Sequence, residues 1–242
     1  MTRHTLQGRT DQDILWFQRR DTLKAAAAWV ALGGYTSAHA QQRSNVVQLT
    51  GDALVNGTRL SAQQTIVTGD QIQTGPGSNL MFVIGDAAFQ VRQNSMLTVE
   101  RGNTINVVSL LRLISGAVVS VWGKGNNRVI VMPTLTAGIR GTGVYSEIFA
   151  NQDGRNYFCN CYGKVDLISA ANNGSALTKT TSQADYHQSF WSEPQGGTLT
   201  PAKAINHSDE ELEFLANLIE QRTTWQKMGK KGNKDGTGEI GY

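Results

Sequence analysis

The chain has 242 residues, with 22 lysines and arginines against 19 aspartates and glutamates, and charged residues make up only 17% of it. Residues 41–242 carry 17 basic and 16 acidic side chains, a near-neutral balance that gives no reason to expect nucleic-acid binding. Low charge combined with 26 glycines and only 4 prolines is typical of many short strands joined by tight turns.

The first 40 residues have the pattern of an export signal. Arg19 and Arg20 precede a short apolar run at 25–32, and Ala38 and Ala40 follow in an A-x-A cleavage motif. The apolar run is shorter than the ~20 residues that a membrane-spanning helix needs. We predict a signal peptide over residues 1–40 and a periplasmic mature protein without a membrane span. An ordinary secretory leader and a retained N-terminal anchor are the alternatives.

The paired arginines also resemble a twin-arginine export signal, although Thr22 stands where such signals often carry phenylalanine. This resemblance implies export of a folded chain, sometimes with its cofactor already bound.

Residues 45–132 alternate between runs rich in β-branched residues and turns that recur about every 8–12 residues. Breakers such as Gly75-Pro76-Gly77 and Gly116 separate apolar runs such as 80–84 and 117–122. No helical period occurs before residue 205, which disfavours alternating strands and helices. We therefore predict an all-β domain over residues 41–170, built as a sandwich, a roll or a short solenoid.

Ordered motifs along this stretch resemble the periplasmic FecR domain. They include VVQLTG at 46–51, GDQIQTG at 69–75 and AGIRGT at 137–142, the last of which contains Gly138, Arg140, Gly141 and Thr142. The resemblance covers about residues 46–170. It implies an all-β periplasmic domain without enzymatic activity, often the sensing half of a regulator in iron-uptake signalling.

The chain departs from the plan of those regulators, in which a cytosolic anti-sigma segment and a membrane helix precede the domain. Only 40 residues precede the expected mature start here. We therefore expect a free-standing, non-catalytic binding or sensing module that acts on an unidentified protein or envelope ligand. No Ser/His/Asp set, phosphate loop or acid pair indicates an enzyme, and the sequence does not indicate the oligomeric state.

Two roles are open for Arg140. Its guanidinium could bind a carboxylate ligand such as an iron chelate, or it could tie turn carbonyls or an acidic residue within the fold. Glycines at 138, 141 and 143 would permit a positive φ or close approach to a neighbouring strand.

The only two cysteines, Cys159 and Cys161, are two residues apart in an extended run, so their side chains should face the same side of a sheet. Two sulfurs that hold one metal ion need to lie only ~3.8 Å apart, whereas a disulfide needs closer Cβ atoms than a C-x-C strand gives. His187 and His207 follow as further ligands. The four side chains predict a Cys2His2 site for Zn²⁺ or a copper ion.

Three other interpretations of these residues are open. In an exported protein, two cysteines can form an oxidised pair, or they can be reduced and buried. A histidine just before a helix, like His207, can pack on the first turn as a staple residue.

The C-terminal part is predicted to contain one amphipathic helix. Ser208 and Glu211 form a capping box, and the apolar face of residues 212–219 predicts a helix at about 208–221 within an extension over residues 171–222. Residues 223–242 combine lysines with five glycines, which predicts a disordered basic tail.

Overall fold

The structure is a computed structural model that describes residues 44–61, 63–104, 106–125, 127–150 and 154–240. The expected export signal, with Arg19, Arg20, Ala38 and Ala40, lies outside the described residues.

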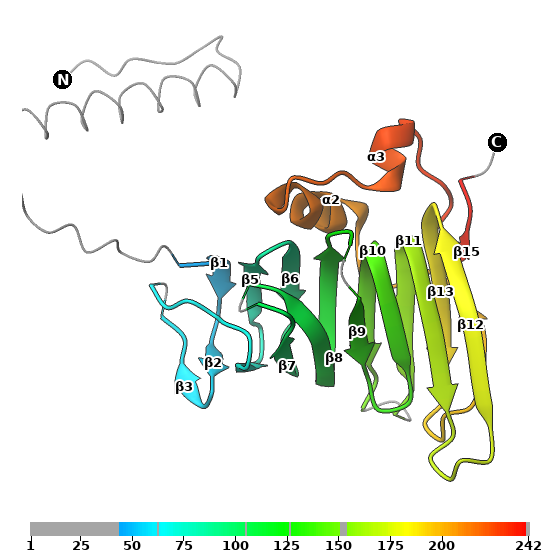
Figure 1. Cartoon of the computed structure of the whole chain (residues 1–242), viewed down its shortest axis with the longest axis horizontal. Helices are drawn as coiled ribbons and strands as arrows, with labels where there is room; N and C mark the ends of the chain where they lie inside the picture. Colours follow the sequence, from blue (N-terminus) through cyan, green and yellow to red (C-terminus); the bar gives the residue numbers. More distant parts are fainter. Residues whose placement is uncertain (1–43, 62, 105, 126, 151–153, 241–242) are drawn as a thin grey trace, which may run out of the picture. The chain divides into compact units, whose positions relative to one another are not determined.

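One sheet of 15 strands runs through the described part of the chain (Figure 1). In order of pairing, its main path is β14-β13-β11-β10-β9-β8-β7-β4-β2-β3, and β1, β5, β6, β12 and β15 pair at its sides. The strands are β1 (Val46–Thr50), β2 (Ala53–Val55), β3 (Thr58–Arg59), β4 (Gln71–Thr74), β5 (Asn79–Ile84), β6 (Ala87–Val91), β7 (Met96–Arg101), β8 (Val108–Trp122), β9 (Arg128–Val131), β10 (Thr136–Ile148), β11 (Asn156–Ala170), β12 (Leu177–Ala184), β13 (Tyr186–Ser192), β14 (Leu199–Ala202) and β15 (Thr237–Gly238). The all-β prediction is confirmed.

The three long strands, β8, β10 and β11, change their neighbours part-way along. The first half of β8 pairs with β7 and β9, and its second half pairs with β6 and β10. Likewise, β11 pairs with β13 through residues 156–160 and with β12 through residues 163–170. One continuous sheet therefore surrounds an apolar interior that draws residues from β2 through β11.

The turning points of these strands are glycines with left-handed backbone, Gly116 (φ 75°), Gly141 (φ 68°) and Gly163 (φ 93°). In β11, Phe158 faces the interior before Gly163 and Val165 faces it afterwards, so the inward positions change from even to odd. Only glycine adopts such a φ at little cost, and a β-bulge of this kind turns a strand.

The bend in β11 decides where the cysteines lie. Cys159 and Cys161 alternate with Phe158, so they face away from the interior and join a second apolar cluster on the outer face. Asn160 points to the opposite side from the cysteines, where it bonds to Thr142 and Ser182. The two sulfurs therefore share one side of the strand, as the C-x-C spacing predicts.

Two helices cover the outer face, α2 (Asp209–Leu218) and α3 (Thr224–Met228), and they lie together along one side of the sheet in Figure 1. The predicted capping box is confirmed, because Glu211 N donates to Ser208 Oγ and Ser208 N donates to the Glu211 carboxylate. Leu212 and Leu215 are fully buried on the cluster that contains the cysteines. Among the described residues, no helix is both long and apolar enough to cross a membrane.

The C-terminal residues differ from the expectation. The predicted boundary at residue 170 is not a division, because β12, β13 and β14 continue the same sheet, and the described residues on both sides of it belong to one compact unit. The predicted disordered tail is wrong up to residue 240. Helix α3 buries Trp225, and β15 pairs with β13. Composition suggested disorder because a single tryptophan among lysines and glycines does not reveal the apolar cluster that receives it.

The bend in β11 can be tested with two matched substitutions. A Cβ at Gly163 would lie 2.9 Å from Thr142 Cβ, whereas at Gly125, with a nearly equal φ of 94°, it would meet nothing within 4 Å. We expect Gly163→Ala to lower the free energy of unfolding by roughly 2–4 kcal/mol and Gly125→Ala by about 1 kcal/mol in urea titrations. Equal losses would show that the close approach to Thr142 has no energetic role.

Candidate metal centre

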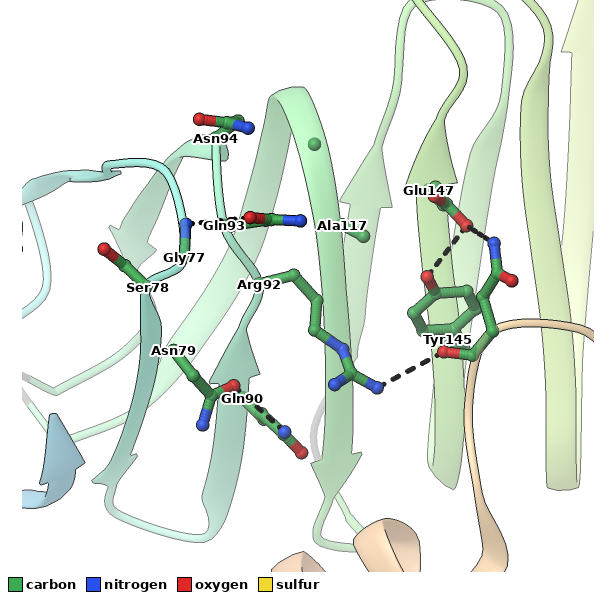
Figure 2. A pocket seen from close by; sticks show the side chains of 12 residues that line it. Gly77, Ser78, Asn79, Gln90, Arg92, Gln93, Asn94, Ala117, Tyr145 and Glu147 are labelled. Atoms are coloured by element: carbon green, nitrogen blue, oxygen red, sulfur yellow. Dashed lines mark hydrogen bonds between the residues drawn. The ribbon is translucent and has the colours of Figure 1, made fainter. Parts of the chain in front are cut away.

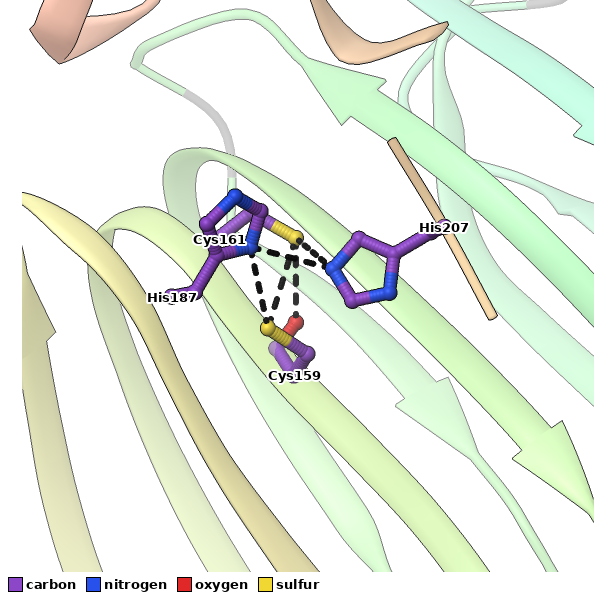
Figure 3. Close-up of side chains that lie close together, drawn as sticks. All are labelled: Cys159, Cys161, His187 and His207. Atoms are coloured by element: carbon purple, nitrogen blue, oxygen red, sulfur yellow. Dashed lines mark hydrogen bonds between the residues drawn. The ribbon is translucent and has the colours of Figure 1, made fainter. Parts of the chain in front are cut away.

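Four side chains from three separate segments meet on the outer face of the sheet (Figure 3). Cys159 and Cys161 come from β11, His187 from β13, and His207 from the loop between β14 and α2. One ligand atom of each lies within 4.8 Å of all the others, and all four residues are buried. The structure therefore brings together every residue of the predicted Cys2His2 set.

Four of the six distances between ligand atoms are close to the edges of a tetrahedron around one metal ion, and all six are within 4.8 Å. The two sulfurs are 3.6 Å apart, Cys159 Sγ lies 3.5 Å from His187 Nδ1, and Cys161 Sγ lies 3.4 Å from His207 Nε2. The two nitrogens, His187 Nδ1 and His207 Nε2, are 3.0 Å apart. Ordinary Zn–S and Zn–N bond lengths give tetrahedral edges of about 3.8, 3.5 and 3.3 Å for the S–S, S–N and N–N pairs.

A local irregularity in β13 turns His187 toward the cysteines. His187 has a φ of 39°, which is uncommon for a residue with a side chain, and the pairing with β15 shifts register between Tyr186 and Gln188. Strained backbone of this kind costs of order 1–3 kcal/mol and is found where function requires it.

Each histidine uses its second nitrogen for a hydrogen bond that leaves the first nitrogen available as a ligand. His187 Nε2 donates to Asp209 Oδ1 at 3.0 Å, and His207 Nδ1 donates to the carbonyl of Ile205 at 2.6 Å. These bonds fix the tautomer in which His187 Nδ1 and His207 Nε2 carry lone pairs toward the sulfurs. Histidines that bind metal ions are usually held by such outer partners.

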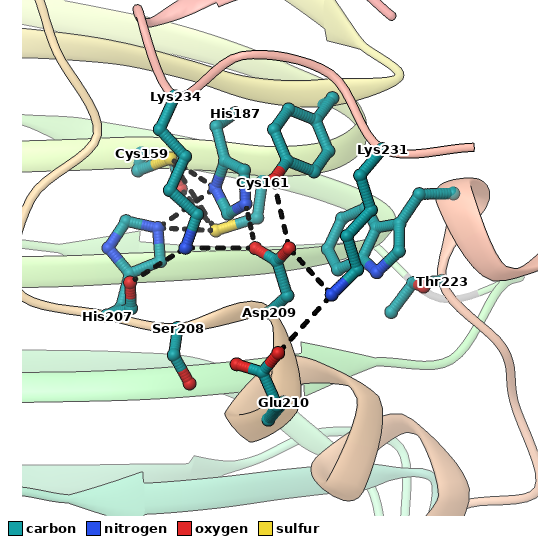
Figure 4. A network of polar contacts seen from close by, with 12 residues as sticks. Cys159, Cys161, His187, His207, Ser208, Asp209, Glu210, Thr223, Lys231 and Lys234 are labelled. Carbon is teal, nitrogen blue, oxygen red and sulfur yellow. Dashed lines mark hydrogen bonds and ion pairs between the residues drawn. The ribbon is translucent and has the colours of Figure 1, made fainter.

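Asp209 is itself held by several donors (Figure 4). Tyr186 Oη donates to its carboxylate at 2.9 Å, and Lys231 Nζ and Lys234 Nζ lie 2.9 and 3.0 Å from its oxygens. Burial alone raises the pKa of Asp209, but the bonds from His187, the two lysines and Tyr186 outweigh it and hold the pKa far below its usual range. The carboxylate that orients His187 is therefore ionised.

The two thiols differ in acidity. Burial raises the pKa of both, but at Cys159 the hydrogen bond from Cys161, with His207 and His187 close by, lowers the pKa well below its usual value. At Cys161, burial and the adjacent Cys159 sulfur hold the pKa well above its usual value. A metal ion takes both sulfurs as thiolates, so its binding would displace any proton that the pair holds.

His187 has a raised pKa in the metal-free site. Burial lowers it, but the hydrogen bond to Asp209 and the nearby Cys159 sulfur raise it by more. His187 Nδ1 lies 3.5 Å from Cys159 Sγ and 3.0 Å from His207 Nε2, so it is the atom of this residue that would bind a metal ion.

Aromatic rings surround the two histidines. Tyr145 stacks on His207 with ring centroids 4.7 Å apart, and Trp225 stacks on His187 at 5.4 Å. Both aromatic side chains are nearly fully buried. These rings fix the imidazole planes and keep water from the site.

The sequence did not indicate the outer partners. No sequence motif marks Asp209 as the partner of a histidine, and Lys231 and Lys234 lie in the predicted disordered tail. Asp209 follows His207 by two residues, but this spacing does not indicate a bond between them. The histidine that Asp209 contacts is His187. The lysines reach the site only because α3 returns the chain to it.

The motif residues at the bend have structural roles. Arg140 donates from Nε and Nη2 to Asp166 Oδ2 at 3.0 and 2.6 Å, which is the structural one of its two expected roles. Thr142 is fully buried and its hydroxyl donates to the carbonyl of Tyr162. Of the glycines, Gly141 has the expected positive φ, whereas Gly138 has neither a positive φ nor a close contact.

No protein-family description matches this chain, and no curated protein is significantly similar to it. Three solved chains resemble its fold. Two of them are crystal structures of a candidate anti-sigma factor from Parabacteroides distasonis ATCC 8503, determined at 1.65 and 2.50 Å resolution. Each is 10% identical to this chain with a TM-score of 0.44.

The matches cover 61% and 63% of this chain, and 64% and 65% of the solved chains. This chain thus spans less than two thirds of the length of the structures it matches. The likeness is too distant to carry an argument about function, and membership of the FecR family stays a prediction from the motifs.

The role of Asp209 can be tested with its neighbour as the control. Asp209→Asn removes the charge that orients His187, and we expect metal affinity to fall about 10–100-fold. Glu210→Gln makes the same chemical change to a carboxylate that also pairs with Lys231 but does not touch a histidine. Competition with a chromogenic chelator measures the metal affinity of each variant. Equal affinities for the two variants would contradict the orienting role of Asp209.

Proposed function

We propose that this protein is a non-catalytic metal-binding module in which Cys159, Cys161, His187 and His207 hold one metal ion. The observation that supports this most is the combination of tetrahedral distances with a hydrogen-bond partner on the second nitrogen of each histidine. A buried polar cluster formed only for packing would not need the free lone pairs to converge on one point.

Charge balance favours Zn²⁺ over Cu⁺. Two thiolates and two neutral imidazoles neutralise a divalent cation, whereas a monovalent ion would leave one negative charge in a fully buried site. The outer charge of Asp209 is already balanced by Lys234, because Lys231 is shared with Glu210 and Glu213. Copper remains the second candidate because thiolate and imidazole ligands suit it as well.

Four protein ligands complete a tetrahedron and leave no position for substrate or an activated water, which is the arrangement of structural zinc sites. The ligands come from β11, β13 and the loop before α2, so the ion would tie the C-terminal segment to the sheet. In this proposal the metal ion stabilises the module, and recognition of a partner takes place on another surface.

This division of roles accommodates the sensing module that the FecR resemblance implies. In an oxidising periplasm, two cysteines with sulfurs 3.6 Å apart are open to oxidation unless a metal ion occupies them. A metal ion loaded before export of the folded chain would protect them.

Metal content is the direct test. We expect protein exported natively and purified without added metal to contain about one equivalent of zinc by mass spectrometry of the metals. We expect Cys159→Ser with Cys161→Ser to reduce this to a trace, because both thiolates are required. Sub-stoichiometric zinc and copper, together with a Cys159–Cys161 disulfide by peptide mass spectrometry, would contradict the proposal.

Metal removal should destabilise the module. An ion at about 1,000 times its Kd stabilises a folded protein by about 4 kcal/mol, so a chelator should lower the Tm of the wild type by several degrees. The double cysteine variant is the control, since a chelator should leave its Tm unchanged. A wild-type Tm that does not respond to complete removal of bound metal would contradict a stabilising role.

A further inference from the structure

An open groove of about 630 Å³ lies on the outer face of the sheet beside the metal centre (Figure 2). Strands β5, β6, β8 and β10 and the loop before α2 contribute its lining. Five of its twelve lining residues are asparagines or glutamines, and the others include one arginine, one glutamate, one tyrosine and one serine. None of the exposed large apolar residues of the described chain lines the groove.

The charged groups of the groove are already engaged within the protein. Arg92 Nη2 lies 2.7 Å from Glu211 Oε1 and donates to the carbonyl of Asn206 at 3.2 Å. Glu147 Oε2 accepts from Tyr145 Oη at 2.8 Å and from Asn206 Nδ2 at 2.9 Å. An anionic or cationic ligand would have to compete with these pairs, so the groove suits an uncharged one.

The carboxamides are oriented by bonds that leave other hydrogen-bonding capacity. Gln93 Oε1 accepts from Gly77 N at 2.8 Å, and in Figure 2 its amino group extends toward the middle of the groove. On the opposite wall, Glu147 and Asn206 supply acceptors. A row of hydroxyl groups, each of which donates and accepts, complements such mixed walls.

A saccharide fits these features better than a peptide. The strands beneath the groove are paired with one another, so a peptide finds no free sheet edge to extend. The lining also lacks the apolar pockets that receive peptide side chains. Tyr145 is only 2% exposed, so recognition would depend on hydrogen bonds and not on stacking against its ring.

One wall of the groove is continuous with the metal centre. Asn206 immediately precedes His207, and Tyr145 both lines the groove and stacks on the His207 ring at 4.7 Å. His207 thus contacts both residues of this wall, while Glu147 also bonds to each of them. A metal ion that fixes His207 would also fix this wall.

We propose that the groove binds an uncharged saccharide and that metal binding strengthens this interaction by holding Asn206 and Tyr145 in place. The second half of the proposal rests on the proposed metal site, and the first half does not.

The saccharide half is tested by calorimetric titration of the metal-loaded protein with malto-, cello- and chito-oligosaccharides. Asn206→Gly keeps the left-handed backbone of this residue (φ 61°) while it removes the carboxamide, so we expect at least ~10-fold weaker binding. Gln183→Ala, an exposed amide on β12 outside the groove, should bind like the wild type. Absence of binding to every saccharide, binding of extended peptides instead, or equal affinity for Asn206→Gly and the wild type would overturn the proposal.

The metal half is tested on the same protein after chelation and after zinc is restored, with metal content measured in each sample. We expect the saccharide affinity to fall at least ~10-fold on metal removal and to recover with zinc. A protein that binds one metal ion but shows unchanged saccharide affinity without it would overturn the coupling alone. A protein that never holds metal would overturn the proposed function and the coupling, while the Asn206→Gly titration would still decide the saccharide half.

Discussion

The reversal of strand faces at three glycines is the constraint on which the rest of this structure depends. At Gly116, Gly141 and Gly163 the long strands bend, and the positions that face the interior change from one parity to the other. Each half of a long strand can therefore direct its apolar residues toward the interior, although the two halves pair with different neighbouring strands. Without the bend at Gly163, the apolar residues of β11 before and after it could not all face the same interior.

The same reversal places polar chemistry where a helix can cover it. Cys159 and Cys161 leave the interior and face a second apolar cluster, which α2 and α3 close. A buried sulfur or imidazole in such a layer needs a partner, because an unpaired polar group there is costly. The two cysteines and two histidines contact one another. His187 also donates to Asp209, and the Asp209 carboxylate pairs with Lys231 and Lys234.

The metal centre and the groove have complementary properties. The four residues of the proposed centre are buried, and as four protein ligands they would leave no open coordination position, which suits a stabilising role. The groove is open and polar, and its charged residues, Arg92 and Glu147, are bonded within the protein. Asn206 and His207 are consecutive residues of one loop, which is the covalent link between the proposed metal centre and the groove.

The sequence by itself determined the all-β class, the capping box at Ser208 and the shared face of Cys159 and Cys161, because these depend on local periodicity and on contacts a few residues apart. It also singled out His187 and His207 as ligands by residue type. Only the tertiary structure decided that the four meet, because their convergence requires the bend at Gly163, the turn of the backbone at His187 and the docking of α2. The sequence also did not indicate the residues that hold the histidines in place. Lys231 and Lys234 look like part of a solvated tail until α3 buries Trp225 and returns the chain to Asp209, a long-range apolar contact that composition does not reveal.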